Sequence, residues 1–178
     1  MLFRSHIDIL VNNAAVFSVL RPVAVGEMNA ALWDRVMAVN VRGPMLLAKH
    51  VVPYMIARKF GKIINVSSGV AYKGMPMMSH YSTSKAALLG LTRSLARELG
   101  EHNICVNTLA PGLIMSDTIS ANTEHLEKYG AVAVGGRAMK RDAYPSDVLG
   151  ALLFLASSPD SDFVTGQTIA VDGGSVNT

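Results

Sequence analysis

Residues 62–85 read KIINVSSGVAYKGMPMMSHYSTSK, and the rest of the chain is organised around this stretch. Residues 63–66 form an apolar run that indicates a strand, and this run ends at Ser67 and Ser68. A loop that contains glycine and methionine follows, and a segment compatible with a helix opens near Tyr81. The order strand, loop, helix is typical of α/β proteins, in which ligands bind where parallel strands end.

Tyr81 and Lys85 are four positions apart, so on a helix both side chains lie on one face, one turn apart. A free tyrosine has a pKa of about 10, which is too high for efficient proton exchange near neutral pH, but a nearby ammonium lowers that pKa. Lys85 is therefore predicted to tune Tyr81. Ser68 would hold the carbonyl or alcohol oxygen of a substrate beside Tyr81. Together the three side chains form a candidate acid/base site.

At these residues the sequence resembles the short-chain dehydrogenase/reductase family, whose pattern of Ser followed by Tyr-x-x-x-Lys matches Ser68, Tyr81 and Lys85. Tyr81 lies thirteen positions after Ser68, and Asn40 matches the family's fourth catalytic position. Tyr-x-x-x-Lys alone is a weak signal, but several motifs occur in the family's order and together cover nearly the whole chain. These motifs are DILVNNAA at 8–15, VNVRG at 39–43, INVSS at 64–68, YSTSK at 81–85, VNTLAPG at 106–112 and GQTIAVDGG at 166–174.

The resemblance implies a single domain over residues 1–178 with a Rossmann-like α/β fold, a doubly wound parallel sheet in a three-layer α/β/α arrangement. It also implies an oxidoreductase that uses NAD or NADP to interconvert an alcohol and a carbonyl in a small-molecule substrate. Tyr81 would be the general acid/base, Ser68 would orient the substrate, and Lys85 would tune Tyr81 and hold the nicotinamide ribose. The resemblance further implies a homo-oligomer, a dimer or a tetramer.

Asn40 would hold a water that links the Lys85 ammonium to solvent, if it acts as its counterpart in the family does. An asparagine without such a resemblance would more simply satisfy a carbonyl that a helix kink has freed. The match to VNVRG favours the first interpretation.

The resemblance assigns cofactor contacts to the ends of two strands. Asn13, Ala14 and Ala15 match the family's Asn-Asn-Ala-Gly, whose backbone runs under the adenosine side of the dinucleotide. Ala15 departs from the usual glycine, which matters only if the position needs a positive φ or a close backbone approach. Without the resemblance, the asparagine pair is also compatible with a turn at a strand end. The resemblance assigns the contacts with the nicotinamide half of the cofactor to Tyr81, Lys85, Pro111, Gly112, Ile114 and Ser116. Ser116 stands where the family more commonly has threonine.

The amino-acid composition limits the classes of protein to which this chain could belong. The 178 residues are 50% hydrophobic and 16% charged, which predicts a globular domain with a packed core. The net charge of +3 is scattered, without a basic stripe interleaved with aromatic residues, so no nucleic-acid partner is expected. No apolar run reaches the ~18 residues of a membrane span, and Arg4, His6 and Asp8 stand where a signal peptide would need its apolar core. We expect a soluble, cytoplasmic protein without a membrane association.

The remaining reactive side chains are assigned no chemistry. Cys105 lies in an apolar run, which favours a buried thiol over a reactive one. The five histidines lack metal-ligand spacing, so no metal site is predicted. Ser68 lacks the Gly-x-Ser-x-Gly surroundings of a serine hydrolase. Met75, Met77 and Met78 are compatible either with a substrate mouth or with simple gap-filling.

Hydrophobic periodicity predicts the elements in chain order. Residues 7–12 are almost continuously apolar, which predicts a strand in the middle of a sheet. Residues 30–58 are predicted to form a long helix that Pro44 and Pro53 kink or break. Residues 117–142 lack clear periodicity and are predicted to be a mobile flap over the site. The other predicted elements are strands at 62–66, 104–110 and 167–171 and helices at 81–99 and 145–157.

A dinucleotide-binding fold opens with a strand, a glycine-rich turn and a helix, and the turn's amides hold the pyrophosphate. Neither Gly-x-Gly-x-x-Gly nor the family's Thr-Gly-x-x-x-Gly-x-Gly occurs, so the sequence is interpreted as N-terminally truncated and as starting at the family's fourth strand. The residue that distinguishes NAD from NADP would be lost with that part. We therefore expect residues 1–178 alone to bind neither cofactor and to associate. A catalytically silent fragment, or an oligomerising interaction module of the same family, is the alternative.

Overall fold

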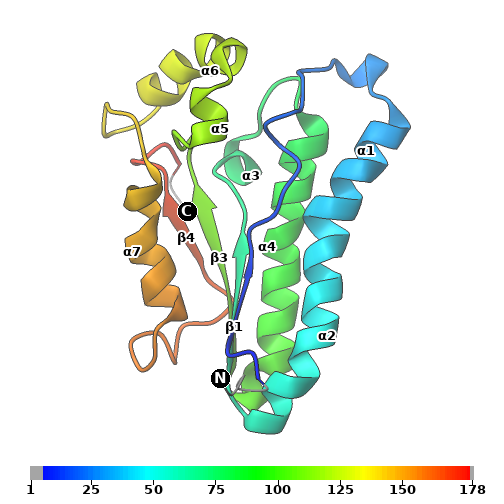
Figure 1. Ribbon diagram of the computed structural model, residues 1–178, viewed down its shortest axis with the longest axis vertical. Coiled ribbons are helices and arrows are strands. Elements are labelled where there is room, and N and C mark those ends of the chain that lie inside the picture. The colour runs from blue at the N-terminus through cyan, green and yellow to red at the C-terminus, as the bar shows by residue number, and fades with distance from the viewer. Residues whose placement is uncertain (1–5, 177–178) are drawn as a thin grey trace, which may run out of the picture.

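The computed structural model describes residues 6–176, apart from the side chains of residues 124, 125 and 128. Its centre is a parallel sheet in which the strands follow the order β1-β2-β3-β4 (Figure 1). The strands are β1 (Ile9–Asn12), β2 (Gly61–Val66), β3 (Ile104–Pro111) and β4 (Thr168–Val171). Because all neighbouring pairs are parallel, the carboxyl ends of the strands meet at one edge of the sheet.

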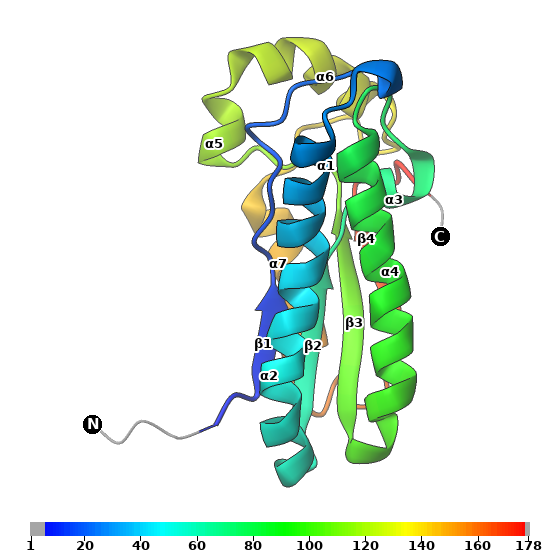
Figure 2. The same ribbon diagram turned by 90° about the vertical axis from the view of Figure 1, so that its right-hand side faces the viewer.

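Helices cover both faces of this sheet. On one face lie α1 (Ala30–Met37), α2 (Gly43–Arg58) and α4 (Ser79–Leu99), and on the other lies α7 (Pro145–Ala156) (Figure 1, Figure 2). Three more helices gather beyond the carboxyl ends of the strands, namely α3 (Val70–Lys73), α5 (Asp117–Ser120) and α6 (Thr123–Gly135). Short 3-10 turns, η1 (Val25–Glu27) and η3 (Gly100–His102), complete the described elements. The arrangement confirms the predicted Rossmann-like, three-layer α/β/α fold.

The two central strands are buried on both faces, as parallel strands between helical layers should be. Ile63 packs with Met55 of α2 and Leu99 of α4, whereas the next residue, Ile64, packs with Leu155 of α7. Successive side chains of a strand point to opposite faces, so one strand serves both halves of the core. All five of these side chains are at most 1% exposed.

A chain of buried polar side chains also crosses the sheet. Asn12 donates to Asn65 Oδ1 at 2.8 Å, Asn65 donates to Thr92 Oγ1 at 2.8 Å, and Thr108 lies 2.8 Å from the same Thr92 hydroxyl. These residues come from β1, β2, α4 and β3, in that order. Hydrogen bonds of this kind remove the cost of burying polar groups and fix the strands and the helix in one register. The sequence did not reveal this network, because its members are far apart in the chain.

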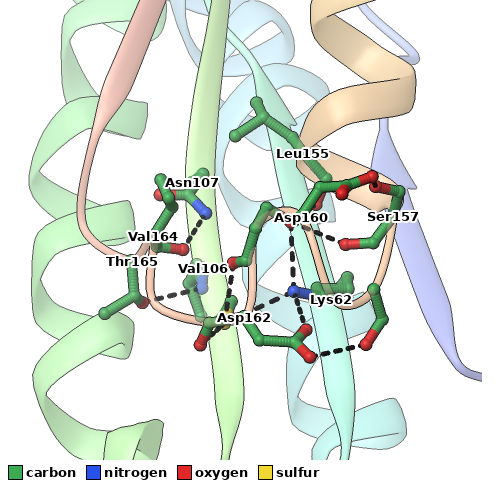
Figure 3. A network of polar contacts seen from close by, with 12 residues as sticks. Lys62, Val106, Asn107, Leu155, Ser157, Asp160, Asp162, Val164 and Thr165 are labelled. Carbon is green, nitrogen blue, oxygen red and sulfur yellow. Dashed lines mark hydrogen bonds and ion pairs between the residues drawn. The ribbon is translucent and has the colours of Figure 1, made fainter.

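At the opposite, amino-terminal end of the sheet, Lys62 is 1% exposed and is held by the segment between α7 and β4 (Figure 3). Its ammonium lies 2.7 Å from Asp162 Oδ1 and donates to Ser161 Oγ at 3.1 Å. The hydrogen bond from Lys62, together with one from the Ser158 hydroxyl, lowers the pKa of Asp162. Nearby, Asn107 donates to the carbonyl of Val164 at 2.7 Å. The contacts fix the path by which the chain enters β4.

The first strand differs from its prediction. β1 lies at the edge of the described sheet, not in its middle, and it starts at Ile9. Ile9 is 44% exposed and Val11 is 38% exposed. Both point to the face on which α7 packs against β2, β3 and β4, so α7 leaves β1 uncovered. Apolar composition identified a strand here correctly, but it did not determine the strand's place in the sheet.

The long helix predicted for residues 30–58 is two helices joined by a π-helical turn at Ala38–Arg42. Pro44 stands in the first turn of α2, directly after the π-helical turn, and Arg42 and Gly43 before it keep helical backbone angles, so Pro44 does not break the helical run. Pro53 lies inside α2, which continues to Arg58. The distortion therefore lies before Pro44, at the turn that contains Asn40.

The flap is more regular than its sequence predicts, because α5 and α6 occupy much of residues 117–142. Ser116 caps α5, where its hydroxyl accepts a hydrogen bond from the amide of Ile119 at 3.4 Å, and Ile119 itself is buried. Gly130 interrupts the apolar pattern of α6 without ending the helix. The sequence did not predict these helices, and the mobility of the flap stays a prediction.

Candidate active site

Ser68, Tyr81 and Lys85 come together at the carboxyl end of β2. Ser68 follows that strand and its side chain is hydrogen-bonded to the Tyr81 hydroxyl. Lys85 lies one turn further along α4, with its ammonium 5.8 Å from the centroid of the Tyr81 ring. The Lys85 ammonium donates to the carbonyl of Val66 at 2.7 Å, and the Ser67 hydroxyl donates to the Lys85 carbonyl at 2.7 Å. These two hydrogen bonds connect the end of β2 to α4 at the site.

The electrostatics of this group differ from the prediction. Burial raises the pKa of Tyr81 to about 12, although the hydrogen bond with Ser68 opposes the rise. Burial also lowers the pKa of Lys85 to about 8, since a buried ammonium is poorly solvated. Lys85 therefore does not bring the pKa of Tyr81 below its ordinary value in this structure. The prediction considered charge alone, whereas burial is the largest cause of the shift and the charge of Lys85 is not among its causes.

Asn40 is 1% exposed and lies in the π-helical turn at Ala38–Arg42. Its side-chain oxygen accepts from the amide of Val16 at 2.8 Å, and its side-chain nitrogen donates to the Val16 carbonyl at 3.2 Å and to Ser84 Oγ at 3.0 Å. Ser84 in turn donates to the carbonyl of Tyr81 at 2.8 Å. Asn40 thus connects the segment after β1 with the helix that carries Tyr81. A water between Asn40 and Lys85 stays a prediction.

The residues predicted to contact the cofactor lie at the carboxyl edge of the sheet. Asn13, Ala14 and Ala15 follow β1 and are exposed. Among the non-glycine residues that the structure describes, positive φ angles occur at Lys59, Met77 and Asn103 only, so Ala15 needs no glycine-like conformation. The departure from the family's glycine therefore introduces no backbone strain.

The turn after β3 carries Pro111, Gly112, Ile114 and Ser116. A Cβ added at Gly112 would lie 3.0 Å from the Cβ of Asp172, so this position favours glycine because the two loops pack closely. Ile114 forms a parallel bridge with Ala143, at the far end of the flap. The side-chain oxygen of Ser116 is engaged as the helix cap described above, while its hydroxyl hydrogen remains to be donated.

Sequence reasoning missed Arg137, which is 4% exposed beneath this turn. Its guanidinium donates to the carbonyl of Leu113 at 2.6 Å and to that of Arg141 at 2.7 Å. Arg137 therefore ties the turn after β3 to the end of the flap. It lies in a stretch without periodicity, so no pattern in the sequence could have identified it.

The cysteine, methionine and histidine residues considered in the sequence analysis differ in their exposure. Cys105 is buried, as predicted. Met78 is 1% exposed and Met77 is 48% exposed, so only the latter is at the surface. His80 is fully buried and neither ring nitrogen has a hydrogen-bond partner among the described residues.

In the part of the chain that the structure describes, no three histidine, cysteine, aspartate or glutamate side chains are grouped closely enough to hold a metal ion. Within residues 6–176, no helix combines the length and the apolar character that a membrane crossing requires.

The fold and the site together define a Rossmann-like α/β protein with a Ser, Tyr and Lys cluster at the carboxyl edge of its sheet. Comparison with known proteins places it further: the chain belongs to the short-chain dehydrogenase/reductase family. The matching family model covers residues 3–176 and is described as enoyl-(acyl carrier protein) reductase.

Similar proteins include two curated relatives and a solved structure. A 3-oxoacyl-(acyl-carrier-protein) reductase of Thermotoga maritima is 42% identical over 172 residues, which cover 96% of this chain and 67% of the relative. Dehydrogenase/reductase SDR family member 4 of Bos taurus is 39% identical, with 96% of this chain and 60% of the relative covered. A crystal structure of a 3-oxoacyl-(acyl-carrier protein) reductase from Brucella melitensis with bound NAD has a TM-score of 0.84 and 34% identity, and the match covers 96% of this chain and 63% of that one.

The chain spans between 59% and 67% of the length of such curated relatives. The interpretation that it starts at the family's fourth strand stays a prediction.

Proposed function

We propose that this protein is an NAD- or NADP-dependent oxidoreductase that interconverts an alcohol and a carbonyl. The observation that carries the proposal is the joining of Ser68, Tyr81 and Lys85 at the carboxyl edge of the sheet, where α/β folds bind ligands. Family membership supports the same class of reaction. The proposal covers a small-molecule substrate and leaves reaction direction open.

Each side chain has a distinct role in the proposal. Tyr81 gives its proton to a carbonyl oxygen during reduction, or accepts a proton from an alcohol during oxidation. Ser68, already hydrogen-bonded to the Tyr81 hydroxyl, orients the same oxygen. With a pKa of about 12, Tyr81 is a neutral phenol near neutral pH and carries the proton that a reduction needs, although burial makes it a weaker acid than a free tyrosine. The nicotinamide, when bound, supplies or accepts the hydride.

The residues at the edge of the sheet fit such a cofactor. The Lys85 ammonium uses one donor on Val66 and has two more for ribose hydroxyls. Asn13, Ala14 and Ala15 offer exposed backbone after β1, and the turn from Pro111 to Ser116 is held in a fixed shape by Arg137. These residues would hold the adenosine side and the nicotinamide side, respectively.

The experiment that tests the proposal is a spectrophotometric assay of NADH and NADPH oxidation with a panel of ketones, and of the reverse reaction with alcohols. In a full-length or complemented form of the protein that binds a dinucleotide, we expect turnover with at least one cofactor and loss of turnover in Tyr81→Phe. The control is Tyr54→Phe, since Tyr54 is a 62% exposed residue of α2 and removal of its hydroxyl should change nothing. Equal loss in both variants, or none in either, would contradict the proposal.

A second candidate is a catalytically silent module that associates through its helices. The observation that favours it is the set of exposed apolar side chains on α2 and α7, which include Leu47 at 50% and Leu153 at 64% exposure. An active oligomer would carry the same surfaces, so they do not exclude catalysis. Retained association of the protein together with no cofactor binding by any form of it would favour this candidate.

A further inference from the structure

Phe17 lies directly against the ring of Tyr81. The two ring centroids are 4.5 Å apart and the ring planes are inclined by 31°. Aromatic pairs at this separation contribute beyond the apolar area that they bury. Tyr81 is 7% exposed, so the contact belongs to the packing that encloses the phenol.

The surroundings of this ring pair are apolar. Tyr81 belongs to an apolar cluster whose other members come from the segment after β1, from α1 and from the region between β2 and α4, and they carry no charge. Besides Phe17, the side chains in this cluster or packed against it are Val16, Leu20, Leu32, Val36, Val70, Met75 and Met78. From α4 itself, Lys85 is the charged group beside the ring, and from the end of β2 the polar group is Ser68. Phe17 therefore contributes aromatic surface to an enclosure that has one polar opening, toward Ser68.

The backbone that carries Phe17 is held on several sides. Asn40 binds both the amide and the carbonyl of Val16, the residue before Phe17. The carbonyl of Phe17 accepts from the amide of Leu20 at 2.9 Å, which closes a turn. Further along, the amide of Val23 donates to the carbonyl of Met77 at 2.8 Å, in the loop that leads into α4. These hydrogen bonds fix the backbone position from which the Phe17 ring reaches Tyr81.

The flap also takes part in holding this segment. The side-chain nitrogen of Asn122, which lies between α5 and α6, donates to the carbonyl of Ser18 at 3.1 Å. Ser18 is the neighbour of Phe17, so one short loop contacts the flap, the turn that contains Asn40 and the entry to the catalytic helix. The contacts of residues 16–23 join three separate parts of the site.

We propose that Phe17 is a positioning residue for Tyr81: its ring covers one side of the phenol, excludes water from it and keeps the hydroxyl directed at Ser68. The inference rests on the proposed function only for its effect on turnover. Its structural part concerns the chain alone and is testable without a cofactor. Burial is the main reason for the raised pKa of Tyr81, so removal of the covering ring should let the phenol ionise more readily.

The first experiment follows the tyrosine rings by NMR in the 178-residue chain labelled at the tyrosine Cζ, with Tyr81→Phe to assign the signal. In the unchanged protein, the Tyr81 signal should remain that of a neutral phenol at about pH 10.5, where exposed tyrosines are mostly ionised. In Phe17→Ala it should show partial ionisation at that pH. The matched control is Val19→Ala, in the same loop at 74% exposure, which should leave the signal unchanged.

Phe17→Leu and Phe17→Tyr keep the test informative if the alanine variant does not fold. Leucine retains an apolar cover without a ring, so the ring-current shift of the Tyr81 signals should be lost while the fold is kept. Tyrosine retains the ring, so the Tyr81 signals should stay near their original positions. If the leucine variant folds and its Tyr81 signals coincide with those of the unchanged protein, the proposal is overturned.

The second experiment uses the form of the protein that turns over substrate. Phe17→Leu should lower kcat by roughly 10-fold to 100-fold, the range for a misplaced reacting group, while the KM for the cofactor changes little. Phe17→Tyr should restore kcat. If the unchanged protein has no activity, the proposed function fails while the NMR result still decides the inference. A leucine variant that raises only the cofactor KM would overturn the positioning role.

Discussion

At the scale of single residues, the site shows how burial and charge compete within one turn of a helix. Tyr81 and Lys85 have opposite charged forms, yet burial disfavours ionisation of both and moves their pKa values apart, to about 12 for Tyr81 and about 8 for Lys85. Spacing in the sequence located the pair correctly because four-residue spacing fixes a shared helix face. It could not give the degree of burial, which depends on side chains from several other elements.

Removal of the phenol oxygen gives the most direct residue-scale prediction. Tyr81→Phe should abolish nearly all turnover in the form that binds a dinucleotide, while cofactor affinity stays close to normal, because the aromatic packing is kept. Ser68→Ala should lower kcat by roughly 10²-fold, as for other positioned donors. Steady-state kinetics with a separate measurement of cofactor affinity would show both effects. A Ser68→Ala variant that loses only thermal stability would instead give that residue a structural role.

Lys85 leads to a prediction about pH. Since its pKa in the folded protein is about 8, the ammonium loses its proton as the pH rises through that value, and its hydrogen bonds to ribose hydroxyls weaken. The KM for the cofactor should therefore rise above about pH 8. Lys85→Arg, which keeps its proton throughout this range, should have a flat profile up to about pH 10.

The measurement for Lys85 is the cofactor KM as a function of pH in both proteins, with Lys49→Arg, an exposed position on α2, as the control. A rise that persists in Lys85→Arg would show that another group titrates. A KM that is independent of pH in the unchanged protein would show that the ammonium makes no contact with the cofactor.

At the scale of elements, the tightest packing lies where α2 returns to the sheet. Gly61 opens β2, and a Cβ at this position would lie 2.5 Å from the Sδ of Met55 and 3.0 Å from its Cβ. Met55 is fully buried, so it has little room to move. The helix and the strand are therefore in contact through a residue that has no side chain.

Gly61→Ala should destabilise the fold by roughly 1–3 kcal/mol through overpacking. Gly90→Ala is the matched control, because Gly90 lies in the interior of α4 with nothing within 4 Å of an added Cβ. That change should stabilise the protein by roughly 0.5–1 kcal/mol, since alanine favours a helix more than glycine does. Urea unfolding of both variants gives the free-energy differences. Equal effects of the two substitutions would show that Met55 moves aside easily.

The elements also show which parts of the fold a sequence predicts. The strands and α4 were predicted to within a few residues, because their apolar runs and the glycine after Leu99 are local signals. The place of β1 in the sheet and the helices of the flap were not predicted. The place of β1 depends on which strands α7 covers, and the start of α5 depends on the cap at Ser116. Neither feature is visible in the hydrophobic periodicity of the sequence. At the site, the motifs supplied the residues that carry chemistry but not Phe17, Ser84 or Arg137, which act through contacts.

At the scale of the whole molecule, apolar surface remains at the edge of the described sheet and on two helices. The outer edge of β1 pairs with no other strand among residues 6–176, and the side chains of Ile9 and Val11, which belong to β1, are exposed. Open strand edges with apolar side chains promote association. Exposed apolar residues on α2 and α7 add to this tendency.

We expect the 178-residue chain to have an average mass above 19.0 kDa by light scattering. Val11→Lys should lower that mass, because a charge at an open edge opposes strand pairing. Val25→Lys is the control, since Val25 is 83% exposed in η1. A monodisperse monomer before any substitution would contradict the expectation, and an equal decrease in both variants would show that net charge, not the edge, controls association.

The hydrogen bond from Asn122 to the carbonyl of Ser18 bears on how this fold could be engineered. Residues 117–142 form a segment that could be exchanged between relatives in order to change substrate selectivity. They are not independent of the reaction centre, however, because Ser18 adjoins the ring that covers Tyr81. A chimera with a foreign flap should therefore retain an amide side chain at position 122, or the loss of that single donor will disturb the phenol along with the selectivity that was meant to change.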